Sequence, residues 1–360
     1  MGKSGRPRHY GAGCAAAARR RGANRLWCTG LVGVVVIGWV PRRADLGAEM
    51  AVRRRGRRLG RRARYAVRDW AAYDRALVSR GDITVWVSPD AVAGWHAPAG
   101  RRTFSDAAIV AALTVRAVYR LALRQAEGLI RSIFAALGLA LPVPDHTTLS
   151  RRGRTLRLDR HVDAGGGLDL AIDSTGLRLA KPPGAGAEGW RKLHIAVDPG
   201  SGRVLAGELT RSDAHDTVPV PAMLGRINGR LGRVYGDGAY AGGPTYRAVA
   251  ERRQALPNAE GVFRPRAPDV RTAAEGRLDP VSGRGRHALV VARDGRAAWE
   301  QTTGYGRRNA AEWTFSRLKR LLGRGLRTRS LDGQRAEVGI AVAALNRMAE
   351  LSLPRAQRVG

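Results

Sequence analysis

Apolar residues recur at helical spacing through much of the first half of the chain. This pattern predicts a helix over 63–79, a second helix that Ser105 caps and that runs to about residue 119, and a third over 123–137. Residues 83–88 instead alternate between apolar and polar, which predicts a short strand. We therefore expect a mainly helical region in this part of the chain.

A further helix is predicted after a short turn at residues 139–144. Asp145 can cap it, and it then carries several polar and basic side chains: Thr147, Thr148, Ser150, Arg151 and Arg152. Helix, turn and capped helix in this order suit a helix-turn-helix that reads DNA through Thr148, Arg151 and Arg152. The alternative is two packed helices with a solvated basic end, and the pattern alone favours neither.

The pattern changes after the glycines at 165–167. Leu168, Leu170 and Ile172 share one face of a predicted strand over 168–173. Strands and helices then alternate: a hairpin of 193–197 and 204–209 joined by a turn at 198–202, helix 217–227, strand 233–235, helix 244–253, strand 261–263, and helices capped by Asn309 (to 322) and Asp332 (to about 351). Residues 267–286 are polar and rich in Gly, Pro and Arg, which predicts an exposed insertion. This order predicts an α+β or α/β fold with a mixed sheet flanked by helices.

The composition points to a partner. The 360 residues hold 63 Lys and Arg against 30 Asp and Glu, a net charge of +33. Such an excess indicates a polyanion, most commonly nucleic acid. Two cysteines exclude a disulfide framework and a zinc site of four cysteines. The longest apolar run, residues 31–40, is far shorter than the roughly 20 residues of a membrane span, so we expect a soluble intracellular protein.

Three segments follow from these patterns. Residues 1–49 lack a regular pattern and form a basic N-terminal extension. This extension is either a functional arm or an upstream addition, with Met50 near the natural start. Residues 50–160 form the helical domain with the helix-turn-helix-like segment, and residues 161–360 form the domain that contains the sheet.

Three acidic residues are candidate metal ligands. Asp173 and Asp237 each end a predicted strand. If these two strands are neighbours, about 4.8 Å apart, the two carboxylates can share an ion. Glu312 is the third candidate, because carboxylate oxygens suit Mg²⁺ or Mn²⁺. Each also has a structural alternative. Asp173 can brace a turn at 174–176, Asp237 can be a simple loop residue, and Glu312 can close a capping box with Asn309.

Cationic residues surround Glu312. Tyr305, Arg308, Glu312 and Lys319 are three, four and seven residues apart. Seven residues span about 10 Å on nearly the same helix face. A carboxylate for a metal ion beside cations for phosphate suits a site that cuts a nucleic-acid backbone. The alternative is an amphipathic helix with a solvated polar face.

Other candidates rank lower. Asp213, His215 and Asp216 could bind a metal ion, but we favour capping of the following helix. Asp169 shares a strand face with Asp173 and competes with it for the same role. Three tryptophans could stack on bases, although core packing is the expected role of each: Trp190, Trp299 and Trp313.

Taken together, the acidic and basic motifs resemble those of DDE transposases of the insertion-sequence IS5 type, within the wider IS4/IS5-like group. The run that ends at Lys319 matches that group's Y-R-E-K signature, and residues 173–176 and 236–240 match its two Asp blocks. The resemblance extends over about residues 65–355. By this resemblance, three residues of the signature would contact DNA at the transposon end: Tyr305, Arg308 and Lys319.

The resemblance implies an RNase H-like fold in which Asp173, Asp237 and Glu312 bind two divalent ions, Mg²⁺ with Mn²⁺ able to substitute. The implied activity is strand cleavage at terminal inverted repeats and strand transfer into target DNA. It further implies a homo-oligomer in the synaptic complex, and a place in the bacterial cytoplasm at the nucleoid. The rival functions are an RNase H-like endonuclease and a catalytically inactive, transposon-derived DNA-binding protein.

Overall fold

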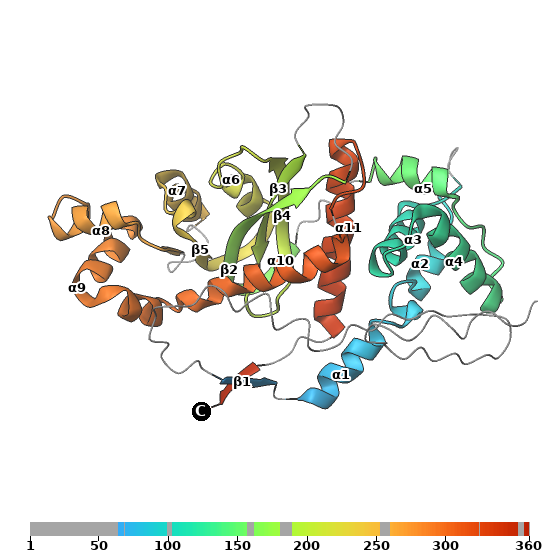
Figure 1. The fold of residues 1–360 in the computed structure, drawn as a ribbon, viewed down its shortest axis with the longest axis horizontal. Coiled ribbons are helices and arrows are strands. Elements are labelled where there is room, and N and C mark those ends of the chain that lie inside the picture. The colour runs from blue at the N-terminus through green and yellow to red at the C-terminus, as the bar shows by residue number, and fades with distance from the viewer. Residues whose placement is uncertain are drawn as a thin grey trace, which may run out of the picture. The chain divides into compact units, whose positions relative to one another are not determined.

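The computed structural model describes residues 64–67, 69–98, 103–156, 162–180, 189–252, 260–323, 325–351 and 356–359 (Figure 1). The predicted extension over 1–49 lies outside these residues. Among the described residues, no helix is both long and apolar enough to cross a membrane.

The first part of the described chain is mainly helical, as expected. Its helices are α1 (Trp70–Ser79), α2 (Pro89–Ala93), α3 (Asp106–Val118), α4 (Leu123–Ala136) and α5 (His146–Gly153). Side-chain oxygens start two of them as predicted: Ser105 accepts from the Ala108 N–H at 3.0 Å, and Asp145 accepts from the Thr147 N–H at 2.8 Å. Residues of α3, α4 and α5 share one buried apolar cluster, which includes Ile109, Ile130 and Leu149.

Two local predictions in this region are wrong. Residues 83–88 do not form a strand, because the Asp82 carboxylate accepts from the Thr84 N–H at 2.9 Å and closes a 3₁₀ turn over Ile83–Val85. The helix expected over 63–79 begins only at Trp70, since Asp69 caps it. Before it lies the strand β1 (Arg64–Val67), which pairs antiparallel with β7 (Ala356–Val359).

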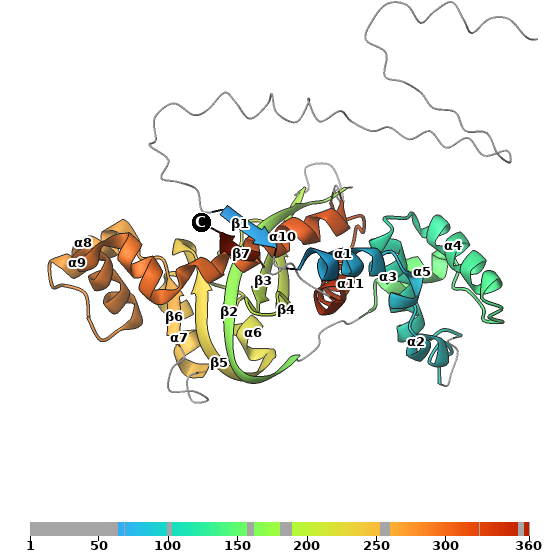
Figure 2. The same cartoon turned by 90° about the horizontal axis from the view of Figure 1, so that it is seen from below.

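A five-stranded mixed sheet forms the second part. Its strands are β2 (Val162–Arg178), β3 (Trp190–Val197), β4 (Val204–Arg211), β5 (Ile227–Gly236) and β6 (Glu260–Phe263), in the order β4-β3-β2-β5-β6. The first three strands pair antiparallel, and β5 and β6 run parallel to β2. Figure 2 shows the strands side by side in this order. The predicted hairpin and the predicted strand near 261–263 are confirmed.

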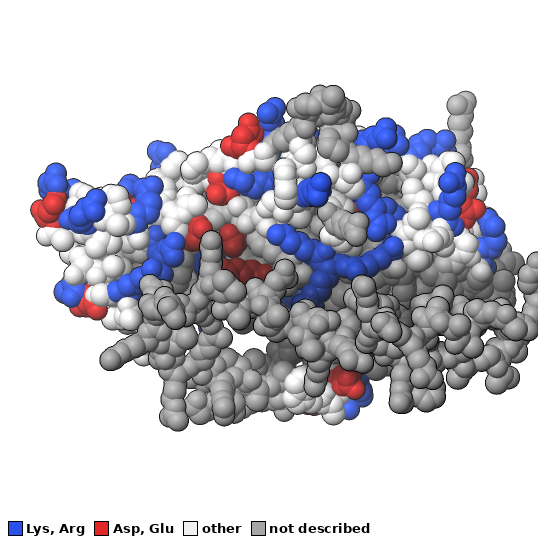
Figure 3. All heavy atoms as spheres, viewed as in Figure 1, with Lys and Arg blue, Asp and Glu red and all other residues white. Residues whose placement is uncertain are grey.

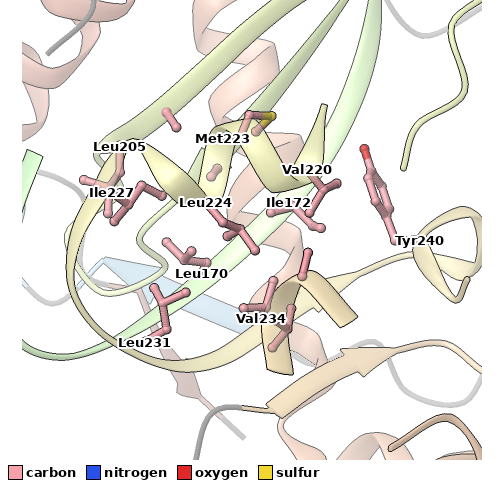
Figure 4. Packing of buried hydrophobic residues seen from close by; sticks show 14 of the residues in the cluster. Leu170, Ile172, Leu205, Val220, Met223, Leu224, Ile227, Leu231, Val234 and Tyr240 are labelled. Carbon is pink, nitrogen blue, oxygen red and sulfur yellow. The ribbon is translucent and has the colours of Figure 1, made fainter. Parts of the chain in front are cut away.

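Helices cover both faces of this sheet. On one face, α6 (Val220–Gly225) and α7 (Gly243–Glu251) pack over Leu170, Ile172 and their neighbours in β5, as Figure 4 shows for α6. On the other face, α10 (Asn309–Leu322) and α11 (Leu331–Leu351) pack over Ala171 and the apolar residues of β3. Each fully buried Leu or Ile contributes about 1.5–3 kcal/mol to this core. The arrangement is the RNase H-like fold that was expected.

The predicted insertion has a regular structure of its own. It contains α8 (Ala267–Ala274) and the start of α9 (Gly283–Thr303), which lie beyond β6 in Figures 1 and 2. Asp269 is buried between them and accepts from the Arg284 guanidinium at 2.5 Å and from Arg266 at 3.4 Å. The Arg284 contact therefore joins the start of α9 to α8.

Candidate active site

Two strand ends bring the aspartates together. The parallel pairing of β2 with β5 ends at Ala171 and Tyr235, so Asp173 and Asp237 each lie two residues beyond the last pair. The two strands are neighbours, which was the condition for their carboxylates to share an ion. The prediction that Asp173 ends its strand is wrong, because β2 continues along β3, where Asp173 pairs with Ile195. The turn expected at 174–176 is therefore absent, whereas β5 does stop, and Asp237 accepts from the Ala239 N–H at 2.8 Å.

Arg308 connects Asp173 to Glu312. Its Nη1 lies 3.5 Å from the Asp173 carboxylate, and its Nη2 lies 2.5 Å from Glu312 Oε1. Glu312 stands in the first turn of α10, on the face of the sheet toward which Asp173 points, and is half exposed. The structure thus brings two carboxylates to one guanidinium. Figure 3 shows acidic side chains gathered near the middle of one face, with basic side chains on both sides.

The environment of Asp173 disfavours its charge. Burial raises the pKa of this carboxyl, the carboxylates of Asp237 and Glu312 add to that rise, and the resulting pKa is about 6. The Ser174 N–H, which donates at 2.8 Å, and the Arg308 guanidinium lower the same pKa and offset part of that rise. The carboxylates of a strand end and of a late helix therefore act electrostatically on Asp173 in the central strand.

Glu312 does not form the capping box considered from the sequence. Arg308, the residue before α10, has helical dihedral angles of φ −53° and ψ −32°, and no side chain caps the helix. A 3₁₀ turn over Tyr305–Arg308 runs directly into α10, so Asn309 is not a cap either. Just before this turn, Gly304 ends α9 with a φ of 67°, in the left-handed region. Glu312 therefore does not cap the helix, and its carboxylate pairs with Arg308 instead.

The remaining Y-R-E-K residues differ in exposure. Lys319 is exposed on α10. Tyr305 is buried, with its ring 4.9 Å from that of Trp299 and 5.9 Å from the Arg308 guanidinium. Tyr305 thus supports Arg308 by packing and does not project from the surface.

Two residues near Tyr305 were not assigned a role in the site from the sequence: His287 was not noticed, and Trp299 was expected only to pack in the core. The Trp299 indole N–H donates to His287 Nδ1 at 3.0 Å, and His287 Nε2 lies 3.0 Å from the Gly261 carbonyl. Core packing is confirmed for Trp299, whereas Trp190 and Trp313 are 52% and 68% exposed, so the expectation for them is wrong. Nothing local marks His287, because its partners lie 12 and 26 residues away.

Asp169 has a different role from Asp173. The β2–β5 ladder shifts register between Leu168 and Leu170, and Asp169 fills the gap by accepting from the Arg233 N–H at 2.8 Å. Its second oxygen pairs with Arg307. Asp169 is therefore a structural acceptor within the sheet.

The prediction for Asp213 and Asp216 is wrong. Pro219 precedes α6 and no side chain caps that helix. Asp216 instead accepts from the Ser174 hydroxyl at 2.6 Å and lies 3.4 Å from Lys192 Nζ. Asp213 pairs with Arg211 at the surface.

His194, which faces Asp216 at 3.8 Å, belongs to the same cluster. Burial lowers its pKa to about 4, so it is neutral at pH 7. The cluster lies on the opposite face of β2 from Asp173, because successive residues of a strand alternate. That alternation was the only signal available in the sequence.

The helix-turn-helix-like segment presents its side chains unequally. Arg152 binds the Asp106 carboxylate at 2.5 Å and the Phe104 carbonyl at 2.9 Å, so it holds α5 to the start of α3. The Thr148 hydroxyl lies 3.2 Å from Asp145 within its own cap. Arg151 is exposed.

The donor chemistry at the strand ends suits a hard divalent cation. Asp173, Asp237 and Glu312 offer carboxylate oxygens, the ligands that Mg²⁺ and Mn²⁺ prefer. The rise that Asp237 and Glu312 add to the pKa of Asp173 shows negative charge near that carboxyl, which a cation would neutralise. As they stand, no three acidic, His or Cys side chains of the described residues are grouped closely enough to hold a metal ion, and Arg308 lies between two of the carboxylates.

Comparison with protein families gives two matches. A family model described as "Transposase DDE domain" matches residues 165–347, about half of the chain, and this range includes all three carboxylates. A second model with the same description matches residues 78–181, which covers much of the helical region and ends just beyond Asp173.

Proposed function

The chain belongs to the family of DDE transposases, and from that premise we propose that it is an IS5-type transposase. Its proposed reactions are cleavage of DNA at the terminal inverted repeats of an insertion sequence and joining of the cut ends to target DNA. The observation that carries this proposal is the equivalent position of Asp173 and Asp237 beyond the last β2–β5 pair, with Arg308 joining Glu312 to Asp173.

Asp173, Asp237 and Glu312 are the proposed metal ligands, for two ions by the resemblance. Bound there, Mg²⁺ or Mn²⁺ supplies Lewis-acid stabilisation of the charge that develops on the phosphate oxygens. The chain's own residues position the DNA. Arg308 has a planar guanidinium suited to two phosphate oxygens, and Lys319 adds a point charge on the same helix.

Recognition of the repeats is proposed for the α4–α5 segment. Arg151 is exposed at the end of α5, so it is the best placed of the three predicted contacts to reach a base or a phosphate. Thr148 is a secondary contact. Arg152 acts mainly by fixing α5 against Asp106, and the charge of +33 attracts DNA at long range. A homo-oligomer at the nucleoid, which can hold two transposon ends, completes the proposal.

A direct test uses the protein with a labelled duplex that carries the inverted repeats flanking its reading frame. In Mg²⁺ or Mn²⁺ we expect a cut at the repeat end and then covalent joining to a target plasmid. EDTA should stop both reactions and leave binding in a gel shift. Cleavage without joining would indicate an endonuclease, and binding without cleavage would indicate an inactive DNA-binding protein.

A further inference from the structure

A cavity of about 580 Å³ lies beside Asp237. The connections that lead into α6, α7 and α8 form its walls, and α10 contributes none of the described residues that line it. Its volume is in the range of pockets that hold a small ligand or a single nucleotide. The cavity therefore lies next to a proposed metal ligand, and neither Arg308 nor Lys319 is among the residues that line it.

The walls of this cavity suit a phosphodiester. Arg264 and Arg266 line it and are exposed, and His215, bonded to the Thr217 hydroxyl at 2.9 Å, also lines it. Arg266 also lies 3.4 Å from Asp269. Burial raises the pKa of Tyr305, and Arg264 is near enough to that phenol to offset part of the rise. Two guanidinium groups beside one carboxylate give the cavity a net positive lining.

Glycine keeps the floor of the cavity open. A Cβ at Gly238 would come within 3.5 Å of the Arg264 carbonyl and 3.8 Å of Arg266 Cγ, so any larger side chain would extend into the space between them. Gly242 is similarly close to Thr217 and Pro244, both at 3.7 Å. Bare backbone beside Asp237 lets a ligand approach the carboxylate directly.

The joining reaction needs two DNA segments at one set of carboxylates. The α10 side carries Arg308 and Lys319, the residues that the resemblance gives to the transposon end. Building on the proposed function, we propose that the cavity between Arg264 and Gly238 binds a nucleotide of the target strand, with Arg264 at its phosphodiester. Each of the two basic flanks of Asp237 then serves one of the two DNA substrates.

The chemistry of this arrangement balances. The 3′ oxygen of the cleaved transposon end forms a bond to the target phosphorus, and the bond from that phosphorus to the target's own 3′ oxygen breaks. The attacking hydroxyl gives its proton to solvent, and the leaving 3′ oxygen takes one up. The number of phosphodiester bonds is unchanged, so no other reactant is needed.

The test separates joining from cleavage with two substrates, an intact terminal-repeat duplex and a pre-cut one that ends in a 3′ hydroxyl. Arg264→Ala should lower joining of the pre-cut end to a plasmid by roughly tenfold or more, because a charge-assisted contact is lost. It should also raise the plasmid concentration needed for half-maximal joining. Cleavage of the intact duplex should fall far less, and Arg264→Lys should recover much of the joining.

Arg247→Ala is the matched control, since Arg247 is exposed on α7 and does not line the cavity. It should leave the ratio of joining to cleavage at the wild-type value. Equal losses of cleavage and joining in Arg264→Ala would show that the cavity holds the transposon end, and wild-type joining would show that it holds no DNA. Either result overturns this proposal alone, whereas a wild-type protein that neither cuts nor joins DNA would overturn the proposed function.

Discussion

Two aspartates on the same face of β2, four residues apart, occupy opposite kinds of environment. Asp169 lies where the β2–β5 ladder shifts register, and it accepts from the Arg233 N–H and pairs with Arg307. Asp173 lies beyond the last β2–β5 pair, where its own burial and the negative charges of Asp237 and Glu312 raise its pKa, which is about 6. The β2–β5 ladder gives the Asp169 carboxylate hydrogen-bond and ion-pair partners, whereas Asp173 lacks enough nearby positive charge to offset its burial and the neighbouring carboxylates.

The difference comes from the backbone and not from the residue type. At the bulge, Gly232 leaves room for the Asp169 carboxylate, since a Cβ there would lie 2.7 Å from its Oδ1. Beyond the end of the ladder, Asp173 accepts from one backbone N–H, and its charged partner is Arg308. Carboxyl groups whose pKa is raised by their surroundings are typical of functional sites, where a bound ligand or metal ion can supply the missing positive charge.

The largest expected effect is on catalysis. Asp173→Asn should lower metal-dependent cleavage of a terminal-repeat duplex by roughly 10³-fold or more, because a lost metal ligand removes several kcal/mol of transition-state stabilisation. Asp237→Asn should do the same. Asp169→Asn should keep cleavage within about threefold, since its amide oxygen can still accept from Arg233. Initial rates in Mg²⁺, measured with gel shifts on the same duplex, check all three, and equal losses in Asp169→Asn would remove the distinction.

The second effect is on stability, with the opposite sign. The folded-state pKa of Asp173 is raised to about 6 from about 4 in the unfolded chain, so the carboxyl disfavours folding once it ionises. In EDTA, its share of wild-type stability should fall as pH rises from about 4 to 6 and stay low above that. Asp173→Asn removes this dependence, so at pH 7 it should be more stable than wild type by about 1–3 kcal/mol.

Urea unfolding of the wild type and Asp173→Asn between pH 4 and 7 measures this effect. A variant that is less stable than the wild type at pH 7 would show that Arg308 and Ser174 outweigh the burial of Asp173. The proposed contrast with Asp169 would then fail on stability.

The smallest effect concerns Asp169 itself. Asp169→Ala removes the acceptor of the Arg233 N–H and should cost about 1 kcal/mol of unfolding free energy. The Arg307 pair should add little, because the Arg307 side chain is 60% exposed. Thermal unfolding in EDTA should therefore place Asp169→Ala below the wild type and Asp173→Asn above it.

Sequence reasoning predicted the candidate site better than its surroundings. Strand adjacency, the carboxylates and the spacing from Arg308 to Glu312 were all available, because hydrophobic alternation and the family motifs are local signals. Long-range partners were not. Asp216 was expected to cap a helix, yet its partners Ser174 and His194 are 42 and 22 residues away.

The same limit explains the errors in secondary structure. Asn309 had the spacing of a capping box, but the 3₁₀ turn before it already continues the helix. Most of the segment at 267–286 is exposed, as predicted, but nothing local shows that Asp269 is buried and bonded to Arg266 and Arg284. The local sequence pattern determines which elements can form, and tertiary contacts determine whether a polar residue is buried or exposed and which groups it bonds to.

The central claim is that Asp173, Asp237 and Glu312 act as one metal site, and Glu312→Gln tests it most directly. Glutamine keeps the shape of the half-exposed Glu312 but removes its charge, and no backbone N–H at the start of α10 depends on the carboxylate. The measurement is nicking of a labelled terminal-repeat duplex in Mg²⁺ or Mn²⁺, beside a gel shift and a melting curve. We predict near-wild-type binding and melting temperature with nicking reduced by roughly 10³-fold or more. Robust nicking by Glu312→Gln would contradict the claim.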